Sequence, residues 1–289
     1  MPHHIQRNDP GGPHPGRAPR RPRGAALLPL GLLLIIGPAL AGCRGNSGGL
    51  SHVCVAGSTS VQPFAEKLAE IYMHQHPEVR IDVQGGGSSA GIYAASQGAA
   101  QLGASSRELA GPEKNLQDIP IAYDGIAVIV HPSNPLANIR LEDIRRIFAG
   151  QLTNWGPLGL KPHPIDIISR EEGSGTREAF EHLVMGTSEV TPGALVEDSN
   201  GSVREIVAGD PHSIGYISAG LVNEQVKALA IDGVLPTLEN IKAQKYRLVR
   251  RFHLVSKEPP GGACKAFIDF VLGPQGQHLL EAEGLVGIK

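Results

Sequence analysis

The chain has 289 residues, which suits one or two domains, and 41% of them are hydrophobic, as is typical of a folded globular protein. Its net charge is −2, and the part after residue 42 holds 21 basic against 27 acidic residues, so nucleic acid and anionic membrane surfaces are poor partners. The three cysteines form no Cys-x-x-Cys pair and no His-Glu-x-x-His motif occurs, so we expect neither a metal site nor a cofactor.

The first 42 residues are typical of an export signal. Arginines at 17–23 precede an apolar stretch at 25–40, which is shorter than the ~20 residues of a membrane-spanning helix. The stretch ends in Leu40-Ala41-Gly42-Cys43, which resembles the lipobox of bacterial lipoproteins. By that resemblance residues 1–42 are a signal peptide and Cys43 is the lipidation site. A plain secretory signal with a chance cysteine is the alternative.

The chain after Cys43 begins with residues 43–50, whose glycine and serine content predicts a flexible tether. Export would permit disulfides, and Cys54 and Cys264 then remain as a pair that either bonds or stays reduced.

The same local order of strand, small polar loop and helix is expected three times. The strands are 53–56, 79–83 and 165–168, and the loops that follow them are 57–60, 85–91 and 173–176. Each helix start exposes unpaired N–H groups and a positive dipole end, which favour a bound anion. Arg170 can add a two-pronged contact to an oxyanion. Taken singly, each loop could also be an ordinary helix cap.

Two further segments join this series. Residues 101–107 predict a short buried strand that runs into another loop of small residues, where Ser105, Ser106 and Arg107 are donors. Residues 119–130 form a long apolar run broken by Asp124-Gly125, so Asp124 is either a turn former or a buried acceptor.

The remaining elements also alternate between strand and helix. Helices are expected over 141–148, 201–208, 263–272 and 275–283, and strands over 213–217, 227–231 and 246–255. This alternation predicts an α/β fold.

Enzyme motifs overlap the same loops, but each is incomplete. Gly85-x-Gly87-x-x-Ala90 fits a relaxed dinucleotide fingerprint without the acid that would hold a ribose. Gly87-x-Ser89-x-Gly91 fits the nucleophile elbow of an α/β-hydrolase, for which His253 is the only late histidine in a strand-like context.

Several segments, in order, carry a resemblance to a known family. They are Gly57-Ser-Thr-Ser-Val61, Gly87-Ser-Ser-Ala-Gly-Ile92, Gly103-Ala-Ser-Ser-Arg107, Ala122-Tyr-Asp-Gly-Ile-Ala127, Ile147-Phe-Ala-Gly150, Thr153-Asn-Trp155, Ser169-Arg170, Gly173-Ser-Gly-Thr-Arg177, Ile214-Gly-Tyr-Ile-Ser218 and Gly276-Gln277. Over residues 51–289 the chain resembles the PstS family, the phosphate-binding lipoproteins of the bacterial phosphate ABC importer.

The resemblance implies a two-lobed α/β fold of the periplasmic-binding-protein type II class, with the ligand in a cleft between lobes joined by two crossover strands. It assigns residues 51–124 plus about 232–289 to lobe I and 125–231 to lobe II, and makes the run at 119–130 one of the crossovers. It further implies a non-catalytic monomer that captures inorganic phosphate outside the cytoplasm and passes it to the permease subunits of an importer.

The resemblance also implies the residues that bind phosphate. They are Thr59, Ser60, Ser88, Ser106, Arg170, Ser174, Gly175 and Thr176, with Ser58, Ser89, Ser105, Arg107, Asp124 and Glu172 as a second tier. Glu172 would hold Arg170 in place, and Asp124 would be a candidate acceptor of the ligand's proton. Where some relatives carry an aspartate as this acceptor, this chain has Ser106, which leaves selectivity for phosphate over sulfate open. A phosphoester hydrolase and a receptor for another tetrahedral or carboxylate anion are the alternatives.

Overall fold

The computed structural model describes residues 50–288, which belong to a single structural unit. The expected signal peptide, the expected lipidation site Cys43 and nearly all of the expected tether therefore lie outside the described residues. Within 50–288, no helix is both long enough and apolar enough to cross a membrane.

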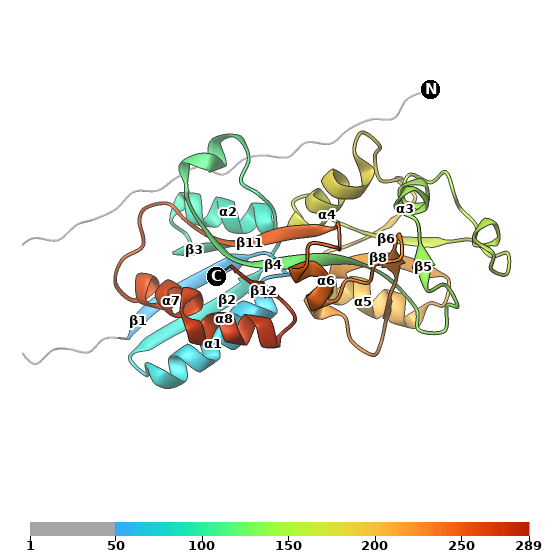
Figure 1. The fold of residues 1–289 in the computed structure, drawn as a ribbon. Helices are drawn as coiled ribbons and strands as arrows, with labels where there is room; N and C mark the ends of the chain where they lie inside the picture. Colours follow the sequence, from blue (N-terminus) through green and yellow to red (C-terminus); the bar gives the residue numbers. More distant parts are fainter. Residues whose placement is uncertain (1–49, 289) are drawn as a thin grey trace, which may run out of the picture. The chain divides into compact units, whose positions relative to one another are not determined.

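The first part of the described chain alternates strands and helices as the sequence predicts (Figure 1). Its elements are β1 (Ser51–Gly57), α1 (Gln62–Gln75), β2 (Val79–Gly85), α2 (Ser88–Gln97) and β3 (Leu102–Ser105). Val53 and Val55 of β1 point into the core, and Phe64 and Leu68 of α1 pack on the same cluster. Pro63 lies in the first turn of α1, where a missing N–H costs nothing.

Strand β4 (Gln117–Val130) is the longest of the described strands and connects the two lobes. Its first part pairs with β11 and β12, while residues 126–130 pair with β8 and β9. Ile126, Val128 and Val130 face one apolar core, and Ala127 and Ile129 face another, which explains the continuous apolar run. The strand passes through Asp124-Gly125 without a turn, so Asp124 is the buried acceptor of the two alternatives.

The second lobe follows β4. Its elements are β5 (Asn138–Ile139), α3 (Leu141–Phe148), β6 (Asp166–Arg170), α4 (Gly175–Phe180), β7 (Leu195–Glu197), α5 (Asn200–Gly209), β8 (Ser213–Ser218), β9 (Lys227–Ala228), β10 (Ala230–Ile231) and α6 (Leu238–Lys242). Helix α4 has only six residues and widens into a π-helical turn at Glu181–Met185.

The chain then returns to the first lobe through β11 (Val249–Ser256), α7 (Gly262–Leu272), α8 (Pro274–Ala282) and β12 (Val286–Gly287). Helix α7 contributes Phe267 and Val271 to the first core, and α8 contributes Leu280. Strand β11 is antiparallel to β4, and the two cross the molecule together between the lobes (Figure 1).

One strand order therefore runs through both lobes, β2-β1-β3-β11-β4-β8-β6-β7. The parallel strands β1, β2 and β3 of the first lobe, and β6 and β8 of the second, end near the line where the lobes meet. Loops at the carboxyl ends of such strands are the usual place for a ligand.

Three expectations differ from the structure. Residues 227–231 form two short strands with different partners instead of one strand. The strand expected from Tyr246 begins at Val249, because Tyr246 and Leu248 pack into the core of the second lobe. Ile241 packs there too, whereas residues from about 232 onward were expected in the first lobe.

The two described cysteines do not form a disulfide. Cys54 on β1 and Cys264 on α7 are both free and half-buried, so of the two alternatives the reduced pair is the one found. Burial raises the pKa of both thiols.

Candidate functional site

Four loops predicted to bind an anion meet between the lobes. Ser60, after β1, lies with its hydroxyl oxygen 2.7 Å from that of Thr176, at the start of α4. Ser88, at the start of α2, lies 3.3 Å from Ser106, which follows β3. Loops far apart in sequence, from both lobes, therefore form a single cluster.

The cluster is buried. Its serine and threonine side chains with at most 2% exposure are Ser58, Ser60, Ser88, Ser106, Ser174 and Thr176, and Thr59 is half-buried. Buried hydroxyls need hydrogen-bond partners. Some of these hydrogen bonds form within the cluster, since Ser58 donates to Ser106 at 2.8 Å and the amide of Ser106 donates to Ser88 at 3.1 Å.

Gly175 is a point of close approach between the two lobes in this cluster. A Cβ built on Gly175 would overlap the hydroxyls of Ser88 and Ser106. The amide of Ser89 also donates to the carbonyl of Gly173 at 3.1 Å, which joins the lobes through the backbone. The absence of a side chain at Gly175 is what permits this approach.

Arg170 is 1% exposed and lies at the end of β6. Its Nη2 donates to Thr59 Oγ1 at 3.2 Å, across the gap between the lobes, and its Nε donates to the carbonyl of Glu197 at 3.1 Å. Its Nη1 has no protein partner although it is buried. An unpartnered guanidinium nitrogen beside a group of hydroxyls is suited to an oxyanion.

The residue that holds Arg170 is Glu171 and not Glu172. Glu171 Oε2 accepts from Arg170 Nε at 2.9 Å, and Oε1 accepts from Nη2 at 3.0 Å. Glu172 is exposed, because the chain turns after Glu171, whose carbonyl accepts from the amide of Ser174. The sequence places two glutamates in a row and does not by itself distinguish them.

Arg250 is a member of the cluster that sequence reasoning missed. It lies on β11 with its side chain 3% exposed, and it donates to Thr176 Oγ1 at 2.9 Å and to Ser60 Oγ at 3.0 Å. It lies in a strand that contains none of the loop motifs, and the strand also holds Arg251 and His253, so no sequence signal singles out Arg250.

Asp124 is the counter-ion of Arg250 and does not face the ligand position. Its Oδ2 accepts from Arg250 Nε at 3.0 Å and Nη2 at 2.8 Å, and its Oδ1 accepts from Ser218 Oγ at 2.8 Å. Burial raises the pKa of Asp124, while Arg250 and Ser218 stabilise the carboxylate. Both oxygens of Asp124 thus accept hydrogen bonds within the protein, and its role as acceptor of the ligand's proton, which the resemblance implied, stays a prediction.

Asn200 was also missed. It lies at the start of α5, is 1% exposed, and its Nδ2 donates to Ser60 Oγ at 2.9 Å and to Thr59 Oγ1 at 3.1 Å. Its Oδ1 accepts from the amide of Ser218 at 3.0 Å. From sequence, an asparagine followed by glycine at a helix start indicates only a cap or turn.

The second-tier residue Arg107 lies beside the cluster, and its guanidinium is paired with two carboxylates. Glu113 accepts from its Nη1 and Nη2 at 2.7 and 2.8 Å, and Glu178 of the other lobe lies 2.7 Å from its Nε. Burial of Arg107 is thus offset by carboxylates, and those ion pairs raise its pKa. Ser105 donates to the carbonyl of Arg107 and Ser89 accepts from its Nη2, so these two serines belong to the same neighbouring group.

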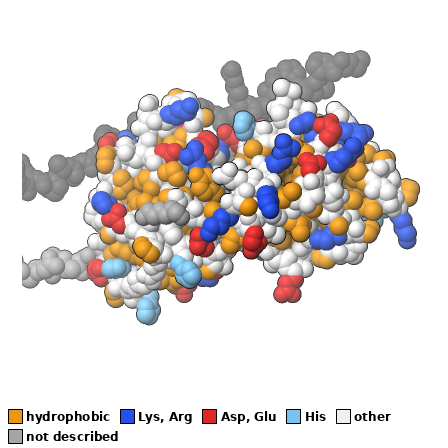
Figure 2. Space-filling model, in the orientation of Figure 1, with side chains coloured by type: hydrophobic (Ala, Val, Ile, Leu, Met, Phe, Trp, Pro, Cys, Tyr) orange, Lys and Arg blue, Asp and Glu red, His pale blue; other side chains and the backbone are white. Residues whose placement is uncertain are grey.

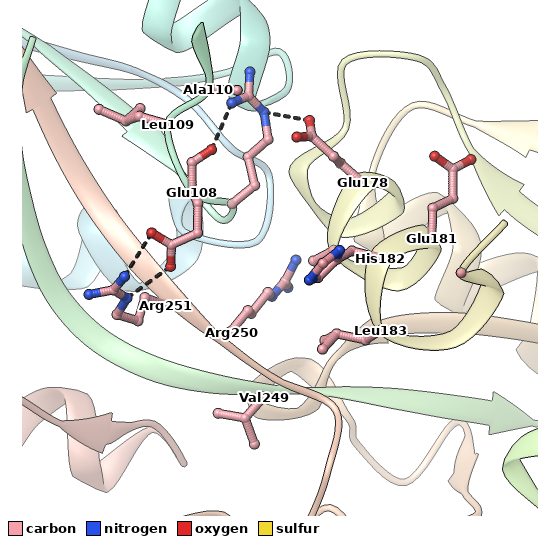
Figure 3. Close-up of a pocket in the computed structure, with 13 residues that line it drawn as sticks. Glu108, Leu109, Ala110, Glu178, Glu181, His182, Leu183, Val249, Arg250 and Arg251 are labelled. Carbon is pink, nitrogen blue, oxygen red and sulfur yellow. Dashed lines mark hydrogen bonds and ion pairs between the residues drawn. The ribbon is translucent and has the colours of Figure 1, made fainter. Parts of the chain in front are cut away.

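A cavity of about 610 Å³ lies next to the cluster, between Glu108 of the first lobe and Glu178 and His182 of the second. Figure 3 shows the side chains of Arg250 and Arg251 on opposite sides of β11, with Arg250 on the side of His182 and Arg251 paired to Glu108. On the face shown in Figure 2, acidic and basic side chains are mixed.

The contacts of Ser89 and His253 give no support to the hydrolase alternative. His253 Nδ1 lies 2.7 Å from Asp118, and Ser89 is engaged by Arg107 and Gly173. A serine nucleophile would need a histidine base within hydrogen-bond reach. Among residues 50–288, no group of three or more His, Cys, Asp or Glu is arranged to hold a metal ion.

Comparisons with known proteins identify the family of this chain. A family model described as "PBP superfamily domain" matches residues 44–275. The phosphate-binding protein PstS of Bacillus subtilis is 33% identical over 233 residues, which cover 79% of this chain and 77% of that protein.

Solved structures are similar as well. A putative phosphate ABC transporter substrate-binding protein from Clostridium perfringens, solved with bound phosphate, is 41% identical with a TM-score of 0.81, covering 83% of this chain and all of that one. An ABC-type phosphate transport receptor from Vibrio cholerae is 36% identical with a TM-score of 0.68, covering 81% of this chain and 99% of that one. The chain therefore belongs to the PstS family of phosphate-binding proteins and has the two-lobed fold of periplasmic binding proteins.

Proposed function

We propose that this protein captures inorganic phosphate outside the cytoplasm and delivers it to the permease subunits of an ABC importer, without catalysing a reaction. The observation that carries the proposal is the unpartnered, buried Nη1 of Arg170 within a cluster of hydroxyls from both lobes. The relatives named for phosphate binding, and the similar structure with bound phosphate, support the choice of anion.

The proposed phosphate ligands are the hydroxyls of Thr59, Ser60, Ser88, Ser106, Ser174 and Thr176, the amides at the start of α4, including that of Gly175, and the guanidinium of Arg170. Fixed N–H and O–H donors can replace the water shell of a dianion in a closed pocket. Each charge-assisted hydrogen bond contributes about 1.5–3 kcal/mol net. A few such bonds match the ~8 kcal/mol of micromolar affinity, and closure of the lobes absorbs the rest.

Ligand exchange requires the lobes to separate. Within residues 50–288, only β4 and β11 carry the chain between them, so these two strands are the proposed hinge. The first lobe then comprises the described chain up to Asp124 and from Val249 onward, and the second comprises the part between. Hinge closure around a ligand is the common motion of two-lobed binding proteins.

Calorimetric titration of the purified protein with phosphate, sulfate and arsenate tests the function directly. We expect saturation by phosphate at one equivalent and no turnover of a phosphoester. Heat with another anion but none with phosphate would assign the pocket to that anion, and phosphoester turnover would revive the hydrolase alternative.

Lipid attachment at Cys43 is a separate proposal, since that residue lies outside the described part. We expect Cys43→Ser to release the protein from the membrane fraction of the cells that produce it. Retention of the variant in that fraction would refute the lipid anchor without affecting the binding proposal.

A further inference from the structure

Arg250 occupies an unusual position, since it belongs to the hinge and also to the binding cluster. Its two terminal nitrogens donate to one hydroxyl from each lobe, Nη1 to Thr176 and Nη2 to Ser60. Both hydroxyls are proposed phosphate ligands. A side chain on a strand between the lobes thus reaches the point where the lobes close.

Asp124 holds this guanidinium in place from the neighbouring hinge strand. Arg250 and Asp124 are direct partners in the antiparallel register of β11 and β4, and the aspartate accepts from Nε and Nη2. The ring of Phe252 lies under the guanidinium, with its centroid 5.2 Å from Cζ. These contacts fix the orientation of the fork, so its outer nitrogens point into the cluster.

We propose that Arg250 is a second anion-binding guanidinium, supplied by the hinge, and that it makes the pocket favour a dianion over a monoanion. The inference rests on the proposed function and adds to it a residue and a charge preference.

The charge preference follows from how the two ion pairs are oriented. Arg170 and Arg250 each lie between a carboxylate, Glu171 or Asp124, and the hydroxyl cluster. Each pair is neutral as a whole, but its positively charged guanidinium faces the hydroxyl cluster. The attraction to a nearby anion grows with the anion's charge, and it is strong because the site is buried. Removing one pair should therefore weaken dianion binding more than monoanion binding.

The main test uses the double variant Asp124→Asn/Arg250→Gln, which removes both charges and leaves net charge unchanged. A single Arg250→Gln change would leave a buried carboxylate without its partner and could unfold the protein. Arg251→Gln is the matched control, since Arg251 is the adjacent arginine and is partly exposed in a pair with Glu108. Phosphate affinity is measured by calorimetry below and above the second pKa of phosphate.

We expect wild type and Arg251→Gln to bind alike. The double variant should bind at least roughly tenfold more weakly where phosphate is a dianion, and should lose clearly less where it is a monoanion. Equal losses at both pH values would mean that Arg250 only positions the hydroxyls, and an unchanged affinity would mean that it plays no part in binding. Either result overturns the inference, whereas failure of wild type to bind phosphate would overturn the proposed function itself.

Arg250→Lys keeps the test decisive if the double variant does not fold. Lysine retains the charge beside Asp124 but cannot form the two-pronged contact. We expect weaker binding than wild type at both pH values with the preference for the dianion retained. Affinity equal to wild type would refute a contact through both terminal nitrogens.

Discussion

Replacing Arg170 by alanine is the sharpest single test of the binding cluster. In the structure Arg170 Nε and Nη2 are occupied by Glu171, Thr59 and two backbone carbonyls, which leaves Nη1 as the nitrogen free for an anion. One charge-assisted hydrogen bond contributes about 1.5–3 kcal/mol, so its loss alone should weaken phosphate binding roughly tenfold to a hundredfold.

The full effect should exceed this lower bound. Without Arg170, the carboxylate of Glu171 remains beside the pocket and repels the anion. Calorimetry of the variant measures the affinity, and thermal unfolding without ligand reports whether the fold is intact. Arg80→Ala, an arginine with an exposed side chain paired to Asp82, is the control and should bind like wild type. An Arg170→Ala protein that is folded and binds within twofold of wild type would refute the assignment of Nη1 to the anion.

Three further changes probe the same cluster. Glu171→Ala should weaken phosphate binding roughly threefold or more, because Arg170 loses two anchoring hydrogen bonds. Glu172→Ala should bind within twofold of wild type in the same titration. A larger loss of affinity in Glu172→Ala than in Glu171→Ala would restore the choice of Glu172. Gly175→Ala should weaken binding at least roughly tenfold with little change in unfolding temperature, since the new methyl group obstructs only the contact between lobes; unimpaired binding would show that the loops need not approach so closely. Asn200→Ala should lower the free energy of unfolding in urea by about 1–3 kcal/mol, because the amide of Ser218 loses its buried acceptor. A loss below ~0.5 kcal/mol would contradict the importance of this hydrogen bond for stability.

Much of the local structure could be predicted from sequence. The helices at 141–148 and 263–272 and the strands at 79–83 and 213–217 follow from the spacing of apolar residues, and the structure has them within a few residues. The long run at 119–130 was expected as a crossover strand, and β4 has this role because residues 117–125 pair with β11 and residues 126–130 pair with β8.

The errors lie where local spacing carries no information on partners. Tyr246 and Leu248 extend the alternation of β11, but they leave the strand and pack into the other lobe. Residues 227–231 are uniformly apolar after Lys227, yet β9 pairs with β4 and β10 pairs with β5. Apolar residues indicate burial but do not state which strand they join.

The sequence by itself determined the loops of the binding cluster, because a strand, a turn of small polar residues and a helix start are set by neighbouring residues. Only the tertiary structure decided which charged groups join them. Arg250 and Asp124 are 126 positions apart and meet because β11 and β4 pair in one register, which also turns Arg250 towards Ser60 and Thr176. The choice of Glu171 over Glu172 likewise depends on the direction in which the chain turns after β6. Such pairings arise from the packing of strands against one another, and no local pattern encodes them.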